Sequence, residues 1–224
     1  MSESGTVFLF DVDNTLLDND RVVADLKRHL VNALGAERQQ RYFAIFERLR
    51  DELGYADYLG ALQRYRIENP REAKILELSS YLVDYPFANR LFPGSLDVID
   101  RMKTLGTPVI LSDGDVVFQP RKIERSGLAE AVEGRVLVYI HKEKELGDVA
   151  TRYPAHHYVL VDDKVRILAA VKQAWGSHVT TVFPRQGHYA LDREAIAKYP
   201  APDVTVERIS DLLDVDASKL AKSS

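Results

Sequence analysis

Short runs of consecutive apolar residues recur along the chain and predict the strands of a parallel sheet. Helices cover both faces of a parallel sheet, so its strands are apolar throughout and not only at alternate positions. Five such runs occupy residues 6–12, 107–113, 134–140, 157–163 and 179–184. Helical patterns lie between the later runs, at residues 95–105, 120–126, 143–152 and 164–174. This alternation predicts an α/β fold with an open, parallel, Rossmann-like sheet and right-handed crossovers.

The connection between the first two predicted strands is unusually long. From Asp11 to Ser112 the chain travels about 100 residues, whereas a whole βαβ unit needs about 30. The expected crossover helix is still present at residues 95–105, and Gly106 ends it. The apolar face predicted for this helix consists of Leu96, Ile99, Met102 and Leu105. Residues 18–89 are therefore surplus to the sheet, and their apolar residues repeat at helical spacing.

We predict two domains from this organisation. The first is an α/β core of residues 1–17 and 90–224, and the second is an all-helical cap of residues 18–89. Ligands of open α/β sheets bind at the carboxyl ends of the strands, and the insertion leaves the first strand at that edge. We expect the cap to cover the edge as a lid. The alternative is that it only enlarges the core or forms a dimer interface.

Composition and charge exclude several classes of partner. Hydrophobic residues make up 46% of the 224 residues and charged residues 29%, as in ordinary globular proteins. The net charge of −4 provides no basic surface for nucleic acid or anionic membranes, and no segment approaches the roughly 20 apolar residues of a membrane span. The absence of cysteine excludes disulfides and thiolate chemistry. We expect a cytoplasmic monomer or homodimer that binds neither nucleic acid nor membrane.

Polar and acidic residues follow three of the predicted strands at the point where each strand ends. A single pair such as Asp11 and Asp13 is most simply the acidic start of a turn. Here, however, polar and acidic residues follow the carboxyl ends of three strands: Asp11, Asp13, Ser112, Asp113, Gly114, Asp115, Asp162 and Asp163. Carboxylates gathered at one edge repel each other unless a cation lies among them. Hard oxygen ligands in an open site suit Mg²⁺, which leaves room for a substrate phosphate.

The same segments resemble, in order, the four motifs of the haloacid dehalogenase-like (HAD) hydrolases. "FDVDNTL" is similar to the first motif, and Ser112 after "PVIL" is similar to the second. "HKEKE" resembles the basic third motif and "VLVDD" the acidic fourth. Residues 18–89 lie where the family inserts a helical cap of the C1 type. The resemblance covers the whole predicted core domain.

This resemblance implies a role for each residue. Asp11 is expected to attack phosphorus and form an aspartyl-phosphate, and Asp13 is expected to protonate the leaving alcohol and then activate water. Thr15 is expected to steady the loop. The resemblance implies phosphate contacts from Ser112, Asp113, Gly114 and Lys142. It also implies Mg²⁺ ligands among Asp11, Asp13, Asp162 and Asp163, Asp13 contributing its backbone carbonyl.

Two choices within these motifs stay open. Lys142 and Lys144 both follow the third strand, and we favour Lys142 as the active-site lysine because it is closer to the strand end. In the fourth motif we favour Asp163 as the direct metal ligand. Asp162 then binds the metal directly, binds it through water, or orients Lys142.

Other polar and aromatic residues are ambiguous from sequence alone. Arg185 and His188 follow the fifth strand, where a solvated loop is favoured over a phosphate contact. Tyr58 and Tyr65 lie at helical spacing in the predicted cap, where core packing is favoured over substrate binding.

The function that the resemblance implies is Mg²⁺-dependent hydrolysis of a phosphoric monoester, with a small phosphorylated metabolite as substrate. Family members that cleave carbon–halogen bonds lack an acid at the position of Asp13, because a halide leaves without a proton. Two alternatives remain: a phosphomutase, which returns the phosphoryl group to the substrate, and a non-catalytic phospho-ligand-binding or regulatory protein. The motifs do not specify which phosphate ester is the substrate.

Overall fold

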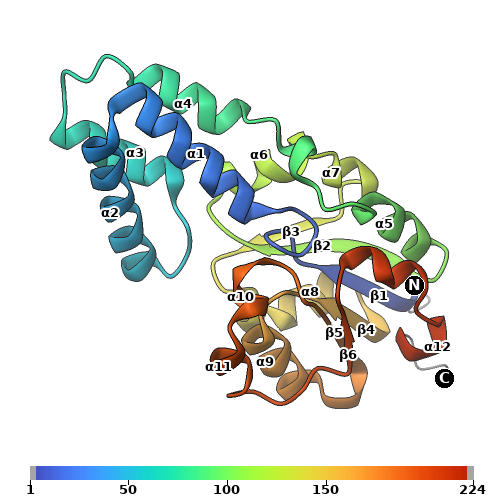
Figure 1. Cartoon of the computed structure of the whole chain (residues 1–224). Helices are drawn as coiled ribbons and strands as arrows, with labels where there is room; N and C mark the ends of the chain where they lie inside the picture. Colours follow the sequence, from blue (N-terminus) through green and yellow to red (C-terminus); the bar gives the residue numbers. More distant parts are fainter. Residues whose placement is uncertain (1–3, 221–224) are drawn as a thin grey trace.

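The computed structural model describes residues 4–220 and contains one six-stranded sheet (Figure 1). All the strand pairs are parallel, and the strand order is β3-β2-β1-β4-β5-β6. The strands are β1 (Ser4–Phe10), β2 (Thr107–Asp113), β3 (Val136–Tyr139), β4 (Ala155–Val161), β5 (Val179–Pro184) and β6 (Val204–Val206). The predicted α/β fold with an open parallel sheet is confirmed.

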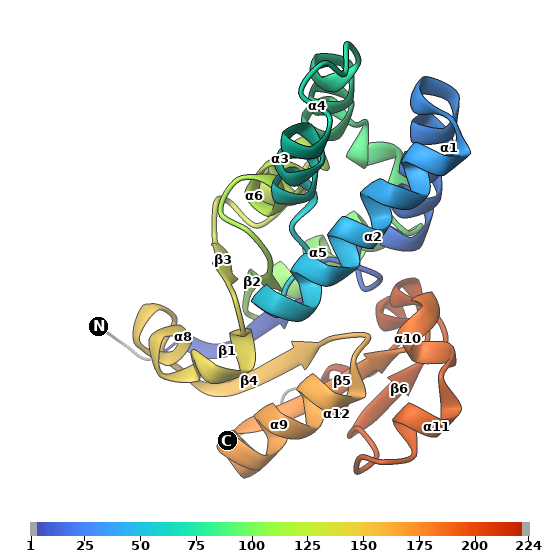
Figure 2. The same cartoon turned by 90° about the vertical axis from the view of Figure 1, so that its left-hand side faces the viewer.

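Alternate residues of each strand pack against opposite helical layers. Phe8 and Phe10 belong to one buried cluster, while Val7 and Leu9 belong to the other. The helices that connect the strands are α5 (Ser95–Lys103), α6 (Phe118–Arg125), α7 (Leu128–Ala131), α8 (Leu146–Arg152) and α9 (Val165–Trp175). Helices α5 to α7 lie on one face and α8 and α9 on the other (Figures 1 and 2). Burial on both faces explains why the strands read as continuous apolar runs.

The structure differs from the sequence prediction in three local details. Leu96 is 40% exposed, so the apolar face of α5 is centred on Val98, Ile99 and Met102. The segment predicted as one helix at 143–152 is a short 3₁₀ helix, η2 (Lys142–Lys144), followed by α8. Strand β6 was not predicted, because a three-residue strand at a sheet edge has too little apolar pattern to recognise.

A helical insertion separates β1 from β2, as predicted. It comprises α1 (Asn19–Leu34), α2 (Ala36–Leu53), α3 (Tyr58–Glu68) and α4 (Ile75–Asp84), followed by the 3₁₀ helix η1 (Phe87–Arg90). The four helices form a lobe beside the sheet (Figure 1). The lobe is the C1-type cap.

The two connections between cap and core run side by side. Leu17 pairs with Leu91 in a short bridge, and the Asp18 N–H donates to the Arg90 carbonyl at 2.8 Å. The Asp18 carboxylate then accepts from the Arg21 N–H at 2.9 Å and begins α1. These contacts are consistent with the proposed cap boundaries, residues 18–89, which we retain as a proposal.

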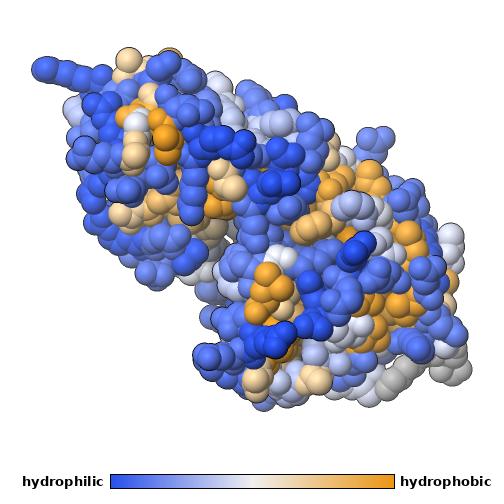
Figure 3. All heavy atoms as spheres, in the orientation of Figure 1, coloured by the Kyte–Doolittle hydropathy of each residue, from blue (hydrophilic) through white to orange (hydrophobic). Residues whose placement is uncertain are grey.

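The C-terminal part completes the core. It contains η3 (Gly176–His178), α10 (Gly187–Leu191), α11 (Arg193–Ile196), η4 (Ile209–Leu213) and α12 (Ala217–Leu220). The surface seen in Figure 3 is mainly hydrophilic, with scattered apolar residues and an indentation between the two lobes. Within residues 4–220, no helix has the length and apolar character needed to cross a membrane.

Candidate active site

A tight loop after β1 fixes Asp11 and Asp13 in different surroundings. The Leu16 and Leu17 N–H groups both donate to the Val12 carbonyl, at 3.0 and 2.9 Å, which turns the chain sharply. Asn14 has a φ of 61° within this turn. Asp11 is only 3% exposed, whereas the Asp13 side chain is 26% exposed. The two carboxylates that are neighbours in sequence therefore have different access to a ligand.

Asp11 lies next to the buried ammonium group of Lys142. The Lys142 Nζ donates to an Asp11 carboxylate oxygen and lies 2.6 Å from Asp162 Oδ2. Burial alone would lower the pKa of Lys142, but the negative charges of Asp11, Asp162 and Asp113 outweigh it and raise that pKa. Burial raises the pKa of Asp162 to about 6, although Lys142 opposes the shift. Lys144, the alternative lysine, is exposed.

Three carboxylates converge where β1 and β4 end. One oxygen from each of Asp11, Asp162 and Asp163 lies within 4.8 Å of the others. Both oxygens of Asp163 are buried and, among the described residues, accept no hydrogen bond. Burial and the charges of Asp162 and Asp11 raise the pKa of Asp163 well above its ordinary value. An ionised Asp163 at this position needs a cation beside it, so the donor set fits a divalent metal ion.

Thr15 joins the first and fourth motifs. Its hydroxyl donates to Asp11 Oδ2 at 3.3 Å and accepts from the Asp163 N–H at 3.0 Å. The Gln186 amide donates to the Thr15 carbonyl at 3.0 Å and so supports the loop from the far side of the site. Lys164, which sequence reasoning missed, is also close. Burial opposes its charge, but Asp11 and Asp163 outweigh that effect and raise its pKa.

The end of β2 supplies Ser112, Asp113 and Gly114, which have different contacts. The buried Ser112 hydroxyl accepts a hydrogen bond from Gln119 at 2.9 Å. The Asp113 carboxylate accepts from the Lys142 N–H at 2.7 Å, and the Gly114 N–H donates to the Tyr139 carbonyl at 2.9 Å. Asp113 and Gly114 thus hold the second and third motifs together. The phosphate contacts that we expect from Ser112, Asp113 and Gly114 stay a prediction.

Two residues of α6 complete the surroundings of Asp13, and neither was identified from the sequence. The Lys122 Nζ donates to Asp13 Oδ1 at 2.6 Å, and the Gln119 amide lies 3.4 Å from Asp13 Oδ2. Asp115 accepts from the backbone N–H groups that begin this helix. Gln119 and Lys122 are three residues apart on a helix, so both lie on one face. This spacing was the only sequence signal that could have linked them to one site.

A cavity of about 450 Å³ separates the core site from the cap. Asp13 and Lys164 line its core side, together with His188, whose ring Nδ1 lies 2.6 Å from the Asp20 carboxylate. Arg185 is exposed and pairs with Glu207. The cap side consists of Asn19, Asp20, Val23, Ala24, Lys27, Phe43, Phe46, Glu47, Arg50, Ala56 and Tyr58. The helical insertion therefore supplies one wall of the cavity.

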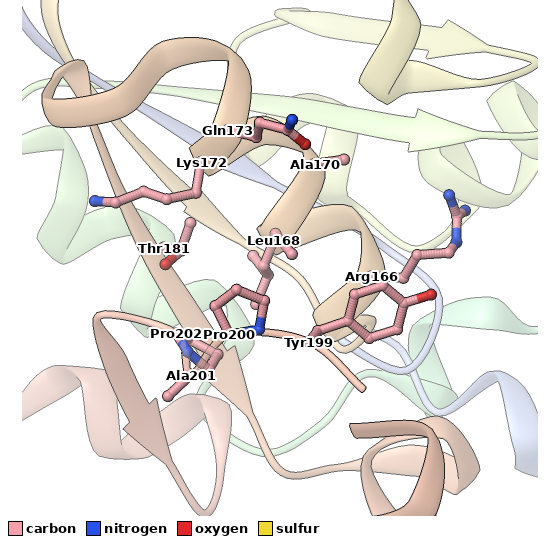
Figure 4. A pocket seen from close by; sticks show the side chains of 11 residues that line it. Arg166, Leu168, Ala170, Lys172, Gln173, Thr181, Tyr199, Pro200, Ala201 and Pro202 are labelled. Carbon is pink, nitrogen blue, oxygen red and sulfur yellow. The ribbon is translucent and has the colours of Figure 1, made fainter. Parts of the chain in front are cut away.

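A second hollow of about 450 Å³ lies between α9 and the segment 199–202, and shares no lining residue with the cap cavity (Figure 4). Two cationic side chains line it, but both are already paired. Arg166 donates to Glu143 at 2.8 Å, and Lys172 donates to Asp203 at 2.8 Å. None of Asp11, Asp162 and Asp163 lines this hollow, whereas Asp13 and Lys164 line the cap cavity.

Replacement of Gly187 by Ala tests how tightly the loop after β1 is held. Gly187 has a φ of 71°, and an added Cβ would lie 2.4 Å from the Asn14 Cβ. We expect a loss of about 1 kcal/mol in the free energy of unfolding from the strained backbone, about 1–3 kcal/mol more from the clash, and a lower kcat because Asn14 adjoins Asp13. Gly127→Ala is the matched control, with a φ of 83° and open space around the added atom. Urea denaturation and kcat measurements compare them, and equal effects of the two substitutions would contradict this account.

The sequence of residues 6–175 matches the family model for haloacid dehalogenase-like hydrolases. The chain belongs to the haloacid dehalogenase-like hydrolases. A solved HAD-like hydrolase from Burkholderia xenovorans LB400 is 62% identical, with a TM-score of 0.91 over 96% of this chain and 98% of that one. A comparison with curated proteins finds no significant match.

More distant solved structures share the fold of this HAD-like hydrolase. The HAD-hydrolase YfnB from Bacillus subtilis, which is bound to magnesium, is 17% identical with a TM-score of 0.61, over 95% of this chain and 98% of that one. The L-2-haloacid dehalogenase from Xanthobacter autotrophicus is 18% identical with a TM-score of 0.60, over 92% and 96% of the two chains. At these identities the similarity establishes the fold alone.

Proposed function

We propose that this HAD-like hydrolase is a Mg²⁺-dependent phosphatase that hydrolyses a small phosphoric monoester through an aspartyl-phosphate on Asp11. The observation that carries the proposal is that two carboxylates only two residues apart in the sequence have different surroundings. Asp11 is buried against Lys142 and Asp162, while Asp13 faces the cap cavity. One carboxylate is held for attack and the other is within reach of a leaving group.

The proposed reaction has two halves. In the first, a carboxylate oxygen of Asp11 bonds to phosphorus as the ester P–O bond breaks, and Asp13 gives its proton to the departing alcohol oxygen. In the second, water attacks the phosphorus of the aspartyl-phosphate, Asp13 takes a proton from that water, and phosphate leaves as Asp11 is regenerated. Lys142 balances negative charge beside Asp11 in both halves.

Asp11, Asp163 and the backbone carbonyl of Asp13 would hold Mg²⁺, with Asp162 mainly engaged by Lys142 and by the Lys164 N–H. Among the described residues neither Asp163 oxygen has a hydrogen-bond donor, whereas one Asp162 oxygen accepts from the Lys164 N–H and the other lies beside Lys142, which supports this choice over Asp162. A bound Mg²⁺ supplies positive charge to the phosphoryl oxygens during the transfer. The magnesium in the B. subtilis structure is in keeping with this cofactor.

The need for an acid such as Asp13 distinguishes a phosphatase reaction from a dehalogenase reaction. An alcohol leaves as a neutral molecule only if an acid protonates it, whereas a halide leaves as a stable anion. An acid that points into the substrate cavity supports a phosphate ester as the substrate. The cavity of about 450 Å³ is in the size range of small-molecule sites.

A panel of phosphate monoesters assayed with Mg²⁺ and with EDTA tests the proposal. We expect phosphate release that depends on Mg²⁺ and that EDTA abolishes, because the metal supplies several kcal/mol of transition-state stabilisation. The same preparation is assayed for chloride release from 2-chloropropionate. Chloride release without phosphate release would reject the phosphatase assignment.

A further inference from the structure

Lys122 is a buried charged residue that the proposed mechanism does not use. It is 1% exposed, and its Nζ donates to Asp13 Oδ1 at 2.6 Å and to Asn19 Oδ1 at 3.1 Å. Burial of an ammonium group is costly unless it is paired and hydrogen-bonded. Both partners of Lys122 lie in or beside the loop after β1, so the charge of Lys122 faces that loop.

Gln119 lies one turn earlier on the same face of α6 and contacts the other oxygen of the same carboxylate. Its amide nitrogen donates to Ser112 Oγ at 2.9 Å and lies 3.4 Å from Asp13 Oδ2. Gly114 permits this approach, since an added Cβ there would lie 2.6 Å from the Gln119 Cβ. Both carboxylate oxygens of Asp13 are therefore held from one helix.

We propose that Lys122 and Gln119 are positioning residues that hold the Asp13 carboxylate toward the leaving-group oxygen. The inference rests on the proposed phosphatase function, because it assigns a role within that reaction. Proton transfer requires the acid within hydrogen-bond reach of the departing oxygen, and a side chain that is 26% exposed has other rotamers open to it. Lys122 and Gln119 of α6 restrict Asp13 to one of these rotamers.

The same contacts connect Asp13 to the cap. Asn19, the second partner of Lys122, is the first residue of α1. Phe118, also on α6, has its ring centroid 5.0 Å from that of Tyr58 on α3. Lys122 thus lies at the seam between core and cap.

A purely structural role for Lys122 makes a different prediction. If the lysine only stabilises the contact between core and cap, its loss destabilises the protein and lowers activity equally on all esters. If it positions Asp13, the loss is greatest for esters whose leaving group needs a proton. The two roles are separated by comparing phenyl phosphate with p-nitrophenyl phosphate, since the nitrophenolate leaves readily as an anion.

The test compares Lys122→Met with Arg121→Met, a neighbour on α6 whose side chain is 38% exposed. We expect Lys122→Met to lower kcat/KM on phenyl phosphate about 30-fold and on p-nitrophenyl phosphate about 3-fold or less, because losing a positioning residue removes only part of the roughly 10²–10⁴-fold that a general acid contributes. We expect Arg121→Met to leave both values unchanged. In an Asp13→Asn background, Lys122→Met should cause no further loss, because the group it positions is absent.

Equal losses on the two esters, or a further loss in the Asp13→Asn background, would overturn the proposal. Crystal structures of the wild type and Lys122→Met provide a readout that needs no turnover. We expect the Asp13 carboxylate to leave its position or to adopt several conformers in the variant, and an unchanged carboxylate would also overturn the proposal. If the wild type hydrolyses neither these two esters nor any other ester of the panel, the phosphatase assignment fails, and the two crystal structures still decide whether Lys122 positions Asp13.

Discussion

Asp11→Asn is expected to reduce kcat at least about 10⁴-fold on every phosphate ester that the wild type hydrolyses, as loss of a nucleophile does in other enzymes. An amide oxygen is a poor nucleophile, so no aspartyl-phosphate forms. The fold should survive, because Lys142 keeps Asp162 as a partner at 2.6 Å. Steady-state assays measure the loss, and mass spectrometry of the rapidly quenched wild type should detect one added phosphoryl group that the variant lacks.

Asp97→Asn is the control for this substitution. Asp97 is an exposed residue of α5 that does not line the cap cavity, so its loss should leave kcat unchanged. A melting temperature of Asp11→Asn near that of the wild type would show that the variant is folded. Activity of Asp11→Asn within about tenfold of the wild type, which corresponds to only 1.4 kcal/mol, would place the nucleophile elsewhere.

Asp163→Asn is expected to have opposite effects on metal binding and on the stability of the metal-free protein. The substitution keeps the volume of the side chain but removes a buried carboxylate whose two oxygens have no hydrogen-bond donor among the described residues. The metal-free variant should therefore unfold at a higher temperature than the metal-free wild type. With Mg²⁺ present, its activity should fall about 100-fold or more, because the metal no longer binds productively.

Thermal denaturation with EDTA and with Mg²⁺ measures both effects. A ligand at 100 times its Kd adds about 2.7 kcal/mol to the stability of the folded state, which raises the melting temperature of a protein of this size by several degrees. We expect this Mg²⁺-induced rise in the wild type and in Asp97→Asn, but not in Asp163→Asn. A full rise in Asp163→Asn would assign the metal to Asp162 or to another group.

The sheet was predictable because its signal is local. Parallel strands covered on both faces read as apolar runs, and the polar residues at their carboxyl ends must meet at one edge. The same reasoning identified the insertion, since the connection from β1 to β2 was far too long for one crossover. It did not identify β6, which is three residues long, or the exposure of Leu96.

The site was predictable only where a motif lies in one short segment. The choice of Lys142 over Lys144 depended on distance from the strand end, and the 3₁₀ turn does bury the first and expose the second. Lys122 and Gln119 were missed because they are 109 and 106 residues from Asp13 in the sequence. Their contact with Asp13 depends on how α6 packs beside the loop after β1, and no short-range pattern encodes that packing.

The paired connections at Leu17 and Leu91 have a consequence for how this protein can change during evolution. The chain leaves the core and returns at adjacent points, joined by the hydrogen bond from Asp18 to Arg90. Helices α1 to α4 can therefore be lengthened, shortened or exchanged as one cassette without altering the order of the strands. Asp11, Lys142 and Asp163 all lie outside that cassette. Descendants can thus change the cap wall of the cavity while they inherit the same core residues.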